Sequence, residues 1–196
     1  MGRVLGAGFA AALDGARGGD DAAFASLWSD LQPSLLRYLG VAGGWAAEDL
    51  ASETWLRIAQ GLDHFEGDET GFRAWVFTIA RHRVLDWRRR ETRARTVTRP
   101  VEHFSGRPAA DDPAADALEK VSTDRALALI ATLPPDQAEV VTLRAVAGLD
   151  VASVARVLGK RPGAVRVLTH RGLRRLAELL GAELPREGPA AGVVTP

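Results

Sequence analysis

Residues 133–176 read LPPDQAEVVTLRAVAGLDVASVARVLGKRPGAVRVLTHRGLRRL, and this stretch decides the fold expected for the C-terminal part of the chain. A proline pair opens its first helix, since proline is tolerated in a first helical turn, and Gly148 ends that helix. Asp150 is placed to cap a short second helix, which Gly159 ends. A longer helix follows over residues 162–180. Helix, glycine-containing turn and helix together predict a helix-turn-helix.

The outward face of the last helix has the composition of a DNA-reading surface. Three of its basic residues recur every four positions, which places them on one helical face. Arginine and histidine can donate hydrogen bonds to guanine edges and to phosphates. The candidate contacts are Arg161, Arg166, His170, Arg171 and Arg174. An ordinary helical hairpin with a basic surface is the alternative, and the absence of any acidic residue over 151–177 disfavours it.

The formal net charge of zero hides a strong sorting of charge along the chain. Residues 14–69 hold eleven acidic and three basic residues, whereas residues 81–99 hold eight arginines and two acidic residues. A second basic block, with seven basic residues and none acidic, spans residues 151–177. Two cationic blocks on an otherwise acidic chain indicate that a polyanion is contacted at two places. A pair of solvated helix faces is the alternative interpretation.

Helical periodicity extends over most of the chain, and no sustained strand pattern is found. Helices are expected near residues 24–35, 46–62 and 72–93, with Pro33 bending or interrupting the first. The prediction is an all-α protein with two small helical domains joined by a flexible linker. Its parts are a flexible N-terminus (1–20), a first domain (21–95), a linker rich in proline (96–117), the helix-turn-helix domain (118–180) and a disordered tail (181–196).

Several classes of function are disfavoured by what the sequence lacks. There are no cysteines, the four histidines show no metal-ligand spacing, and no phosphate-binding glycine loop or nucleophile motif is present. The acidic cluster at residues 63–69 is more simply a solvated turn than a cation site. We therefore expect no catalysis, no metal and no cofactor. No apolar stretch approaches the roughly 20 residues of a membrane span, and no signal peptide is apparent, so a cytoplasmic protein without membrane insertion is expected.

Taken together, these motifs resemble a known family. Residues 133–137, 148–149, 154–155, 158–159 and 163–173 resemble region 4 of the extracytoplasmic function (ECF) group of bacterial RNA polymerase sigma factors. The segment EDLASETWLR at 48–57 resembles the polymerase-binding helix of region 2, and FRAWVFTIARHRVLD at 72–86 resembles its promoter-melting helix. A single helix-turn-helix would be a weak signal, but both regions occur in the family's order, separated by a linker.

The resemblance implies a role in transcription initiation and assigns roles to particular residues. Core RNA polymerase would be bound by Asp49, Glu53 and Leu56. The −10 promoter element would be bound by Arg73, Arg81, His82, Arg88 and Arg89. The −35 element would be read by the five residues of the last helix named above. Loop 62–71 would hold a base flipped out of the stack, and an anti-sigma factor is a possible further partner.

Two questions remain open at the level of sequence. Trp75 and Phe77 could stack on bases, although aromatic residues at helical spacing more often belong to a core. A stand-alone helix-turn-helix regulator that binds duplex DNA as a dimer is the alternative to a sigma factor. Such a regulator has no use for the basic segment 72–90 and the acidic helix before it.

Overall fold

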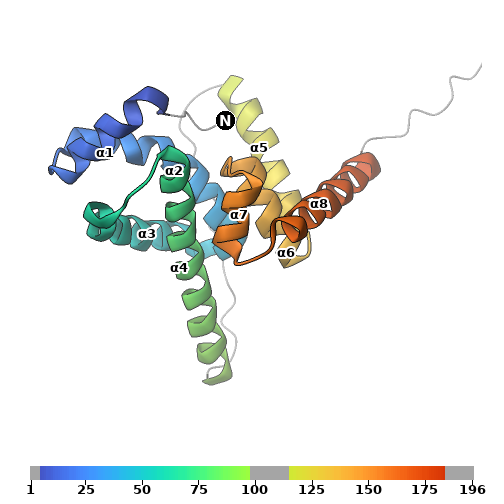
Figure 1. The fold of residues 1–196 in the computed structure, drawn as a ribbon. Helices are drawn as coiled ribbons and strands as arrows, with labels where there is room; N and C mark the ends of the chain where they lie inside the picture. The colour runs from blue at the N-terminus through green and yellow to red at the C-terminus, as the bar shows by residue number, and fades with distance from the viewer. Residues whose placement is uncertain (1–4, 98–114, 184–196) are drawn as a thin grey trace, which may run out of the picture.

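A computed structural model describes residues 5–97 and 115–183, and within these ranges it contains helices and no strand (Figure 1). The all-α fold with two domains is therefore confirmed. The first domain comprises α1 (Phe9–Arg17), α2 (Asp21–Gly43), α3 (Ala47–Gly61) and α4 (Glu69–Val97), with short 3-10 turns η1 (Gly6–Gly8), η2 (Gly44–Ala46) and η3 (Leu62–His64). The second comprises α5 (Ala115–Ala131), α6 (Pro135–Val141), the π-helical turn η4 (Thr142–Val146), α7 (Val151–Leu158) and α8 (Pro162–Glu183).

The first domain is built around the N-terminal half of α4. Phe72, Val76, Phe77 and Ala80 recur at helical spacing and are at most 1% exposed. This apolar face packs against α2 and α3, whose own buried residues also recur at steps of three and four. The C-terminal half of α4 projects beyond the rest of the fold (Figure 1). One helix thus supplies both core and exposed surface.

Helix α2 passes through Pro33 without interruption, so of the two effects expected there, a bend or an interruption, the interruption is wrong. Pro33 is exposed, and the helix is held on both sides by buried leucines such as Leu31 and Leu35. The Asp20 side chain caps this helix by accepting from the N–H groups of Ala22 and Ala23. Burial of the apolar face therefore outweighs the hydrogen bond that proline cannot donate.

The flexible N-terminus expected over residues 1–20 needs correction. Residues 6–17 form η1 and α1, and α1 packs against α2. Phe9 and Leu13, four positions apart, are 6% and 4% exposed and join the core. The signal was weak in the sequence because these two apolar residues stand among alanine and glycine. Residues 98–114 and 184–196, which include most of the expected linker and tail, lie outside the described residues.

The helix-turn-helix forms as expected, from α7, a turn and α8. The carboxylate of Asp150 accepts from Ser153 N at 2.6 Å and caps α7. Gly159 ends this helix in the left-handed conformation, with φ of 63°, which costs glycine no steric energy. Pro162 then opens α8, and the fully buried Val165 anchors its first turn to the core.

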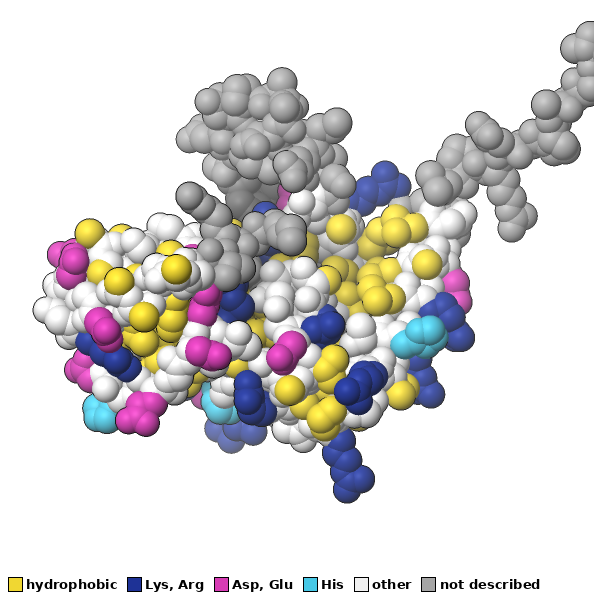
Figure 2. Space-filling model, turned by 45° about the horizontal axis from the view of Figure 1, so that its top comes forward, with side chains coloured by type: hydrophobic (Ala, Val, Ile, Leu, Met, Phe, Trp, Pro, Cys, Tyr) yellow, Lys and Arg dark blue, Asp and Glu magenta, His cyan; other side chains and the backbone are white. Residues whose placement is uncertain are grey.

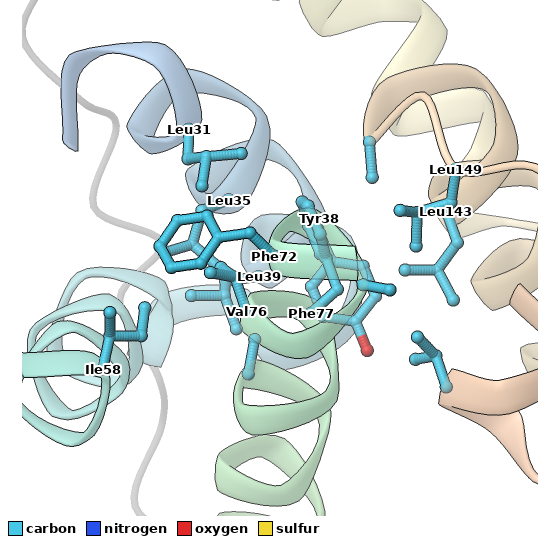
Figure 3. Packing of buried hydrophobic residues seen from close by; sticks show 14 of the residues in the cluster. Leu31, Leu35, Tyr38, Leu39, Ile58, Phe72, Val76, Phe77, Leu143 and Leu149 are labelled. Atoms are coloured by element: carbon cyan, nitrogen blue, oxygen red, sulfur yellow. The ribbon is translucent and has the colours of Figure 1, made fainter. Parts of the chain in front are cut away.

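The two domains pack against each other and share one hydrophobic core. Helix α4 contacts α7, and α2 contacts α5, α6 and η4. Leu143 and Leu149 of the second domain lie in one cluster with Tyr38 and Phe77 of the first (Figure 3). The Tyr38 and Phe77 rings meet edge to face at 5.5 Å between centroids. The sequence predicted two domains on a tether but did not indicate this contact.

Gly172 of α8 gives a direct test of how closely α8 packs on α6. A Cβ at this position would lie 2.7 Å from Cγ2 of Val141, which is buried. We expect Gly172→Ala to lower the free energy of unfolding, because overpacking costs about 1–3 kcal/mol and exceeds the roughly 0.5–1 kcal/mol gained by replacing a helical glycine. Urea unfolding followed by circular dichroism measures this change.

Gly163→Ala is the matched control, since no atom lies within 4 Å of a Cβ at that position of the same helix. It should leave stability unchanged or raise it. A Gly172→Ala protein more stable than the wild type would contradict the packing described here.

Candidate nucleic-acid interface

All five candidate DNA contacts of the second domain are exposed. Arg161 lies in the turn before α8, and the other four, Arg166, His170, Arg171 and Arg174, lie along this helix. Arg174 forms an ion pair with Glu178 at 3.5 Å, and both side chains are about two-thirds exposed. An exposed pair of this kind contributes little to stability, so it leaves the guanidinium free to exchange partners. The face is available to a ligand in this structure.

Three features fix the orientation of this face. Val165 is fully buried on the inner side of α8, while Gly172 permits the close approach to α6. Lys160 in the turn donates to Asp136 of α6 at 3.1 Å. Leu173 is 50% exposed. The helix therefore turns its basic residues outward on a rigid support.

Helix α4 carries its candidate DNA contacts in different environments. His82 and Arg89 are exposed, and Arg89 makes only a 3.5 Å ion pair with Asp86 of the same helix. Arg88, also exposed, donates from Nη2 to the main-chain oxygen of Ala42 at 2.6 Å. These three residues lie where α4 begins to leave the body of the fold, so a strand can approach them.

Arg81 is half-buried and engaged across the domain junction. Its Nε donates to Glu139 of α6 at 3.0 Å, and each side chain is 22% exposed. The hydroxyl of Tyr38 donates to the same carboxylate at 3.3 Å. Burial raises the pKa of Tyr38, and the negative charge of Glu139 adds to this effect. Sequence analysis missed Glu139, which lies 58 positions from Arg81.

Arg73 lies inside the first domain. It donates to Asp30 at 2.6 Å, with its own side chain 11% exposed, and Glu69 is 3.8 Å away. Burial raises the pKa of Asp30, whereas the charge of Arg73 acts in the opposite direction. Removing Arg73 from this pair would leave a buried carboxylate alone, which is costly. The structure therefore gives Arg73 a role in holding α2 to α4 and leaves it out of reach of a strand.

The two aromatic residues singled out on α4 both pack within the domain. Phe77 is fully buried against Tyr38. Trp75 is partly buried, with its ring centroid 5.2 Å from that of Phe65 and 5.7 Å from that of Phe72. Phe77 belongs to the core, and Trp75 supports the loop that joins α3 to α4.

Helix α3 presents a surface of opposite sign. Asp49, Glu53 and Leu56 follow one another at steps of four and three and are all exposed, with Leu56 at 62%. Their opposite face is buried on the core through Leu50 and Ile58. Acidic side chains gather on the side of the molecule where α1 and α3 lie, and basic ones on the side of α7 and α8 (Figure 2).

The described residues also bear on two other kinds of site. No group of three or more histidine, aspartate or glutamate side chains there is arranged to hold a metal ion. No helix within residues 5–97 and 115–183 is long and apolar enough to cross a membrane.

The helices that carry these charged faces lie in ranges of the chain that match known protein families. Residues 27–94 match the family model described as Sigma-70 region 2, and residues 123–176 match Sigma-70, region 4. The first range contains α3 and most of α4, and the second contains the helix-turn-helix. The chain belongs to the ECF group of sigma factors, as its relatives show, and is a transcription initiation factor by class.

Two curated relatives show the extent of the likeness. The ECF RNA polymerase sigma factor BldN of Streptomyces coelicolor is 36% identical over 86% of this chain, and the match spans 64% of BldN. ShbA of Streptomyces griseus is 37% identical over 82% of this chain and 89% of its own length. Among solved structures, the sigma factor RpoE of Bartonella quintana, crystallised with the anti-sigma factor NepR, shares the fold. It has a TM-score of 0.64 and 23% identity, over 82% of this chain and 98% of RpoE.

Asp150 offers a test of how the helix-turn-helix is held. Hydrogen bonds from Ser153 lower the pKa of Asp150 below its ordinary value of 3.8. The ionised carboxylate therefore stabilises the folded state above that value, and its contribution is lost as the pH falls through the lowered pKa. At pH 7 we expect Asp150→Ala to cost about 0.5–2 kcal/mol, as for other helix caps, and the cost should shrink in acid. Urea unfolding over a pH series measures both.

Asp150→Asn is the matched control, because asparagine also caps helices but does not titrate. Its stability should stay near that of the wild type at pH 7. An alanine variant whose loss is the same at pH 7 and in strong acid would show that the carboxylate charge contributes nothing.

Proposed function

We propose that this sigma factor binds core RNA polymerase through α3, holds the −10 element with α4 and the loop before it, and reads the −35 element with α8. The observation that carries the proposal is the presence of two exposed basic faces and one exposed acidic face on two domains of the family. Each face is supported by a buried side of the same helix. A single DNA-reading domain would need only one of them.

The −35 element would be read in the major groove by α8. In a helix-turn-helix the first residues of the second helix contact base edges, and neighbouring basic residues contact phosphates. Arg161 lies in the turn before α8 and Arg166 lies near the start of the helix, and His170, Arg171 and Arg174 extend the same basic surface. All five are exposed, so no rearrangement within the second domain is needed to bring them to DNA.

The −10 element would be held as an opened strand. His82, Arg88 and Arg89 are exposed on α4 and can neutralise phosphates of a single strand. Arg81 joins them once its ion pair with Glu139 is broken. Segment 62–71 comprises η3, the loop after it and the first residues of α4. It would hold one unstacked base, which offsets the few kcal/mol that unstacking costs. Arg73 is left out of this set because of its buried pair with Asp30.

The exposed face of α3, which is acidic with one apolar residue, would bind core polymerase. Asp49 and Glu53 can pair with basic residues of a partner, and Leu56 supplies apolar area that is exposed in the free protein. Glu53 is 3.8 Å from Arg90, and both side chains are well exposed, so this weak contact is readily exchanged.

Regulation by an anti-sigma factor belongs to the same proposal. A cavity of about 280 Å³ lies between the two domains, lined by Val41, Val84 and Leu85 of the first and by Leu133 and Pro135 of the second. These five residues are apolar, and charged residues, among them Arg81 and Glu139, complete the lining. An inhibitor seated there would hold the domains together and keep Arg81 from DNA.

Transcription in vitro tests the function. Core polymerase and the purified protein are incubated with a pool of genomic promoter fragments, and the transcripts are sequenced. We expect transcripts that begin downstream of two shared sequence elements, whereas core polymerase alone should show no such selection. Failure of the protein to bind core polymerase would overturn the proposal.

The polymerase-binding face makes a sharper prediction. The double variant Asp49→Ala with Glu53→Ala should bind core polymerase about tenfold or more weakly, since loss of charged interface groups removes roughly 1.4 kcal/mol or more. Fluorescence anisotropy of the labelled protein, titrated with core polymerase, measures the affinity.

The matched control is Asp63→Ala, which removes an exposed acidic residue beyond the end of α3. Its affinity should equal that of the wild type. Equal binding by the double variant and the wild type would show that α3 is not the polymerase-binding element.

A further inference from the structure

Helix α1 and the turn before it are bound to the segment that joins α3 to α4 and to the first residue of α4. At its C-terminal end, the guanidinium of Arg17 donates to two main-chain oxygens of that segment, from Nε to Leu62 at 3.3 Å and from Nη2 to Phe65. Near its N-terminal end, the carboxylate of Glu69 accepts from the N–H groups of Leu5 and Gly6 at 3.0 and 2.9 Å. The region 2 match begins at residue 27, so α1 lies outside it.

Aromatic packing reinforces the tie. The ring of Phe9 on α1 lies 5.5 Å from that of Phe72, which in turn lies 5.2 Å from the ring of Phe65 in the loop. Gly67 has a φ of 149° and faces Phe65, and a Cβ there would lie 3.0 Å from that ring. The path of the loop therefore depends on α1 as well as on α4.

A cavity of about 650 Å³ lies between α1 and the loop. Its volume is within the roughly 300–1,000 Å³ of small-molecule sites, which is ample for one nucleobase. Phe9, Ala10 and Leu13 of α1 form an apolar wall, and Glu66 and Asp68 lie on the loop opposite it. An apolar side that faces polar groups is suited to a base, which has an apolar face and a polar edge.

The charge of the cavity indicates which part of a nucleotide it accepts. Its lining contains four carboxylates and a single guanidinium, that of Arg17. Such an excess of negative charge repels phosphate, whereas carboxylate oxygens accept hydrogen bonds from the amino groups of bases. Within the described part of the chain, Glu66 makes no hydrogen bond or ion pair, so its carboxylate is available.

We propose that α1 forms the second wall of the pocket for the unstacked −10 base, and that Arg17 is a positioning residue that holds the loop in shape. The pocket takes a base that carries an exocyclic amino group in preference to thymine. This inference rests on the proposed function, in which loop 62–71 holds such a base. It adds two things to that function: a role for α1, which lies outside the region 2 match, and a preference for bases that carry an amino group.

The test uses polymerase reconstituted with the full chain and the −10 strand of a promoter found by the transcription experiment. Each nucleotide of the labelled strand is replaced in turn by an abasic residue, and binding is measured. In the wild type, loss of one base should weaken binding about tenfold, the order expected for one stacked base. In Arg17→Met, the loss at that position should fall to roughly twofold or less, because the base no longer stacks in a formed pocket.

Arg37→Met is the matched control, since it removes the same charge from α2, away from the cavity lining. In Arg37→Met, removal of the base at the sensitive position should weaken binding of the strand as much as it does in the wild type. If no position is sensitive in the wild type, the base-holding role of the loop fails. If a position is sensitive and stays equally so in Arg17→Met, that role stands and the role of Arg17 is overturned.

A second variant avoids dependence on the folding of Arg17→Met. Ala10→Phe fills the cavity from the exposed wall of α1 without touching the hydrogen bonds of Arg17, and Ala25→Phe adds the same group to an exposed site on α2. Only Ala10→Phe should remove the sensitivity to base loss. Unchanged sensitivity in Ala10→Phe would exclude this cavity as the pocket.

The chemical preference is tested at the same position of the strand. Replacement of the native base by thymine should weaken binding by the wild type nearly as much as the abasic residue does, while cytosine or adenine should bind well. If the strand with thymine binds as tightly as the strands with cytosine and adenine, the preference for an amino group is wrong. The proposal that α1 forms one wall of the pocket is unaffected by that result.

Discussion

The burial of the first half of α4 is the constraint on which the rest of the molecule depends. Phe72, Val76 and Phe77 pack against α2 and α3, while the following turns meet α7 of the other domain. Because the start of the helix is fixed from all these sides, its second half can extend into solvent and keep a defined direction. The packing of the first half of α4 therefore sets the direction in which the basic residues of its second half point.

The burial of the first half of α4 also gives the arginines of this helix different roles. Arg73 and Arg88 lie on one helix, but Arg73 is held by Asp30 within the core and Arg88 is exposed. Arg81, between them, is held by Glu139 at the junction of the domains. The environment of each guanidinium, and not its distance along the helix, decides whether it is available to a phosphate.

The helices could be predicted from the sequence because their signals are local. The cap at Asp150, the glycine at 159 and the proline at 162 lie within the elements that they delimit, and the apolar periodicity of α4 is nearly complete. Helix α1 was missed because its two core residues stand in a stretch of alanine and glycine, where periodicity is weak. Pro33 was misjudged because its neighbours' burial outweighs a local preference.

The exposed basic residues of the candidate site could be predicted from the sequence, but the long-range contacts of its arginines could not. Exposure of the basic residues of α8 follows from helical spacing, so those residues could be chosen from the sequence. The burial of Arg73, the pair of Arg81 with Glu139 and the contact of Arg17 with the loop depend on residues 43 to 58 positions away. No local pattern contains that information.

The junction of Glu139 with Arg81 and Tyr38 has a consequence for the energetics of assembly. A protein that must place its two domains on separate stretches of DNA has to separate them first, and the closed form described here competes with that open form. The apparent affinity for any partner of the open form is lowered by the fraction of molecules that are open. A partner that binds the open and closed forms equally well leaves the molecule closed, whereas a partner that binds the open form more tightly shifts it towards opening.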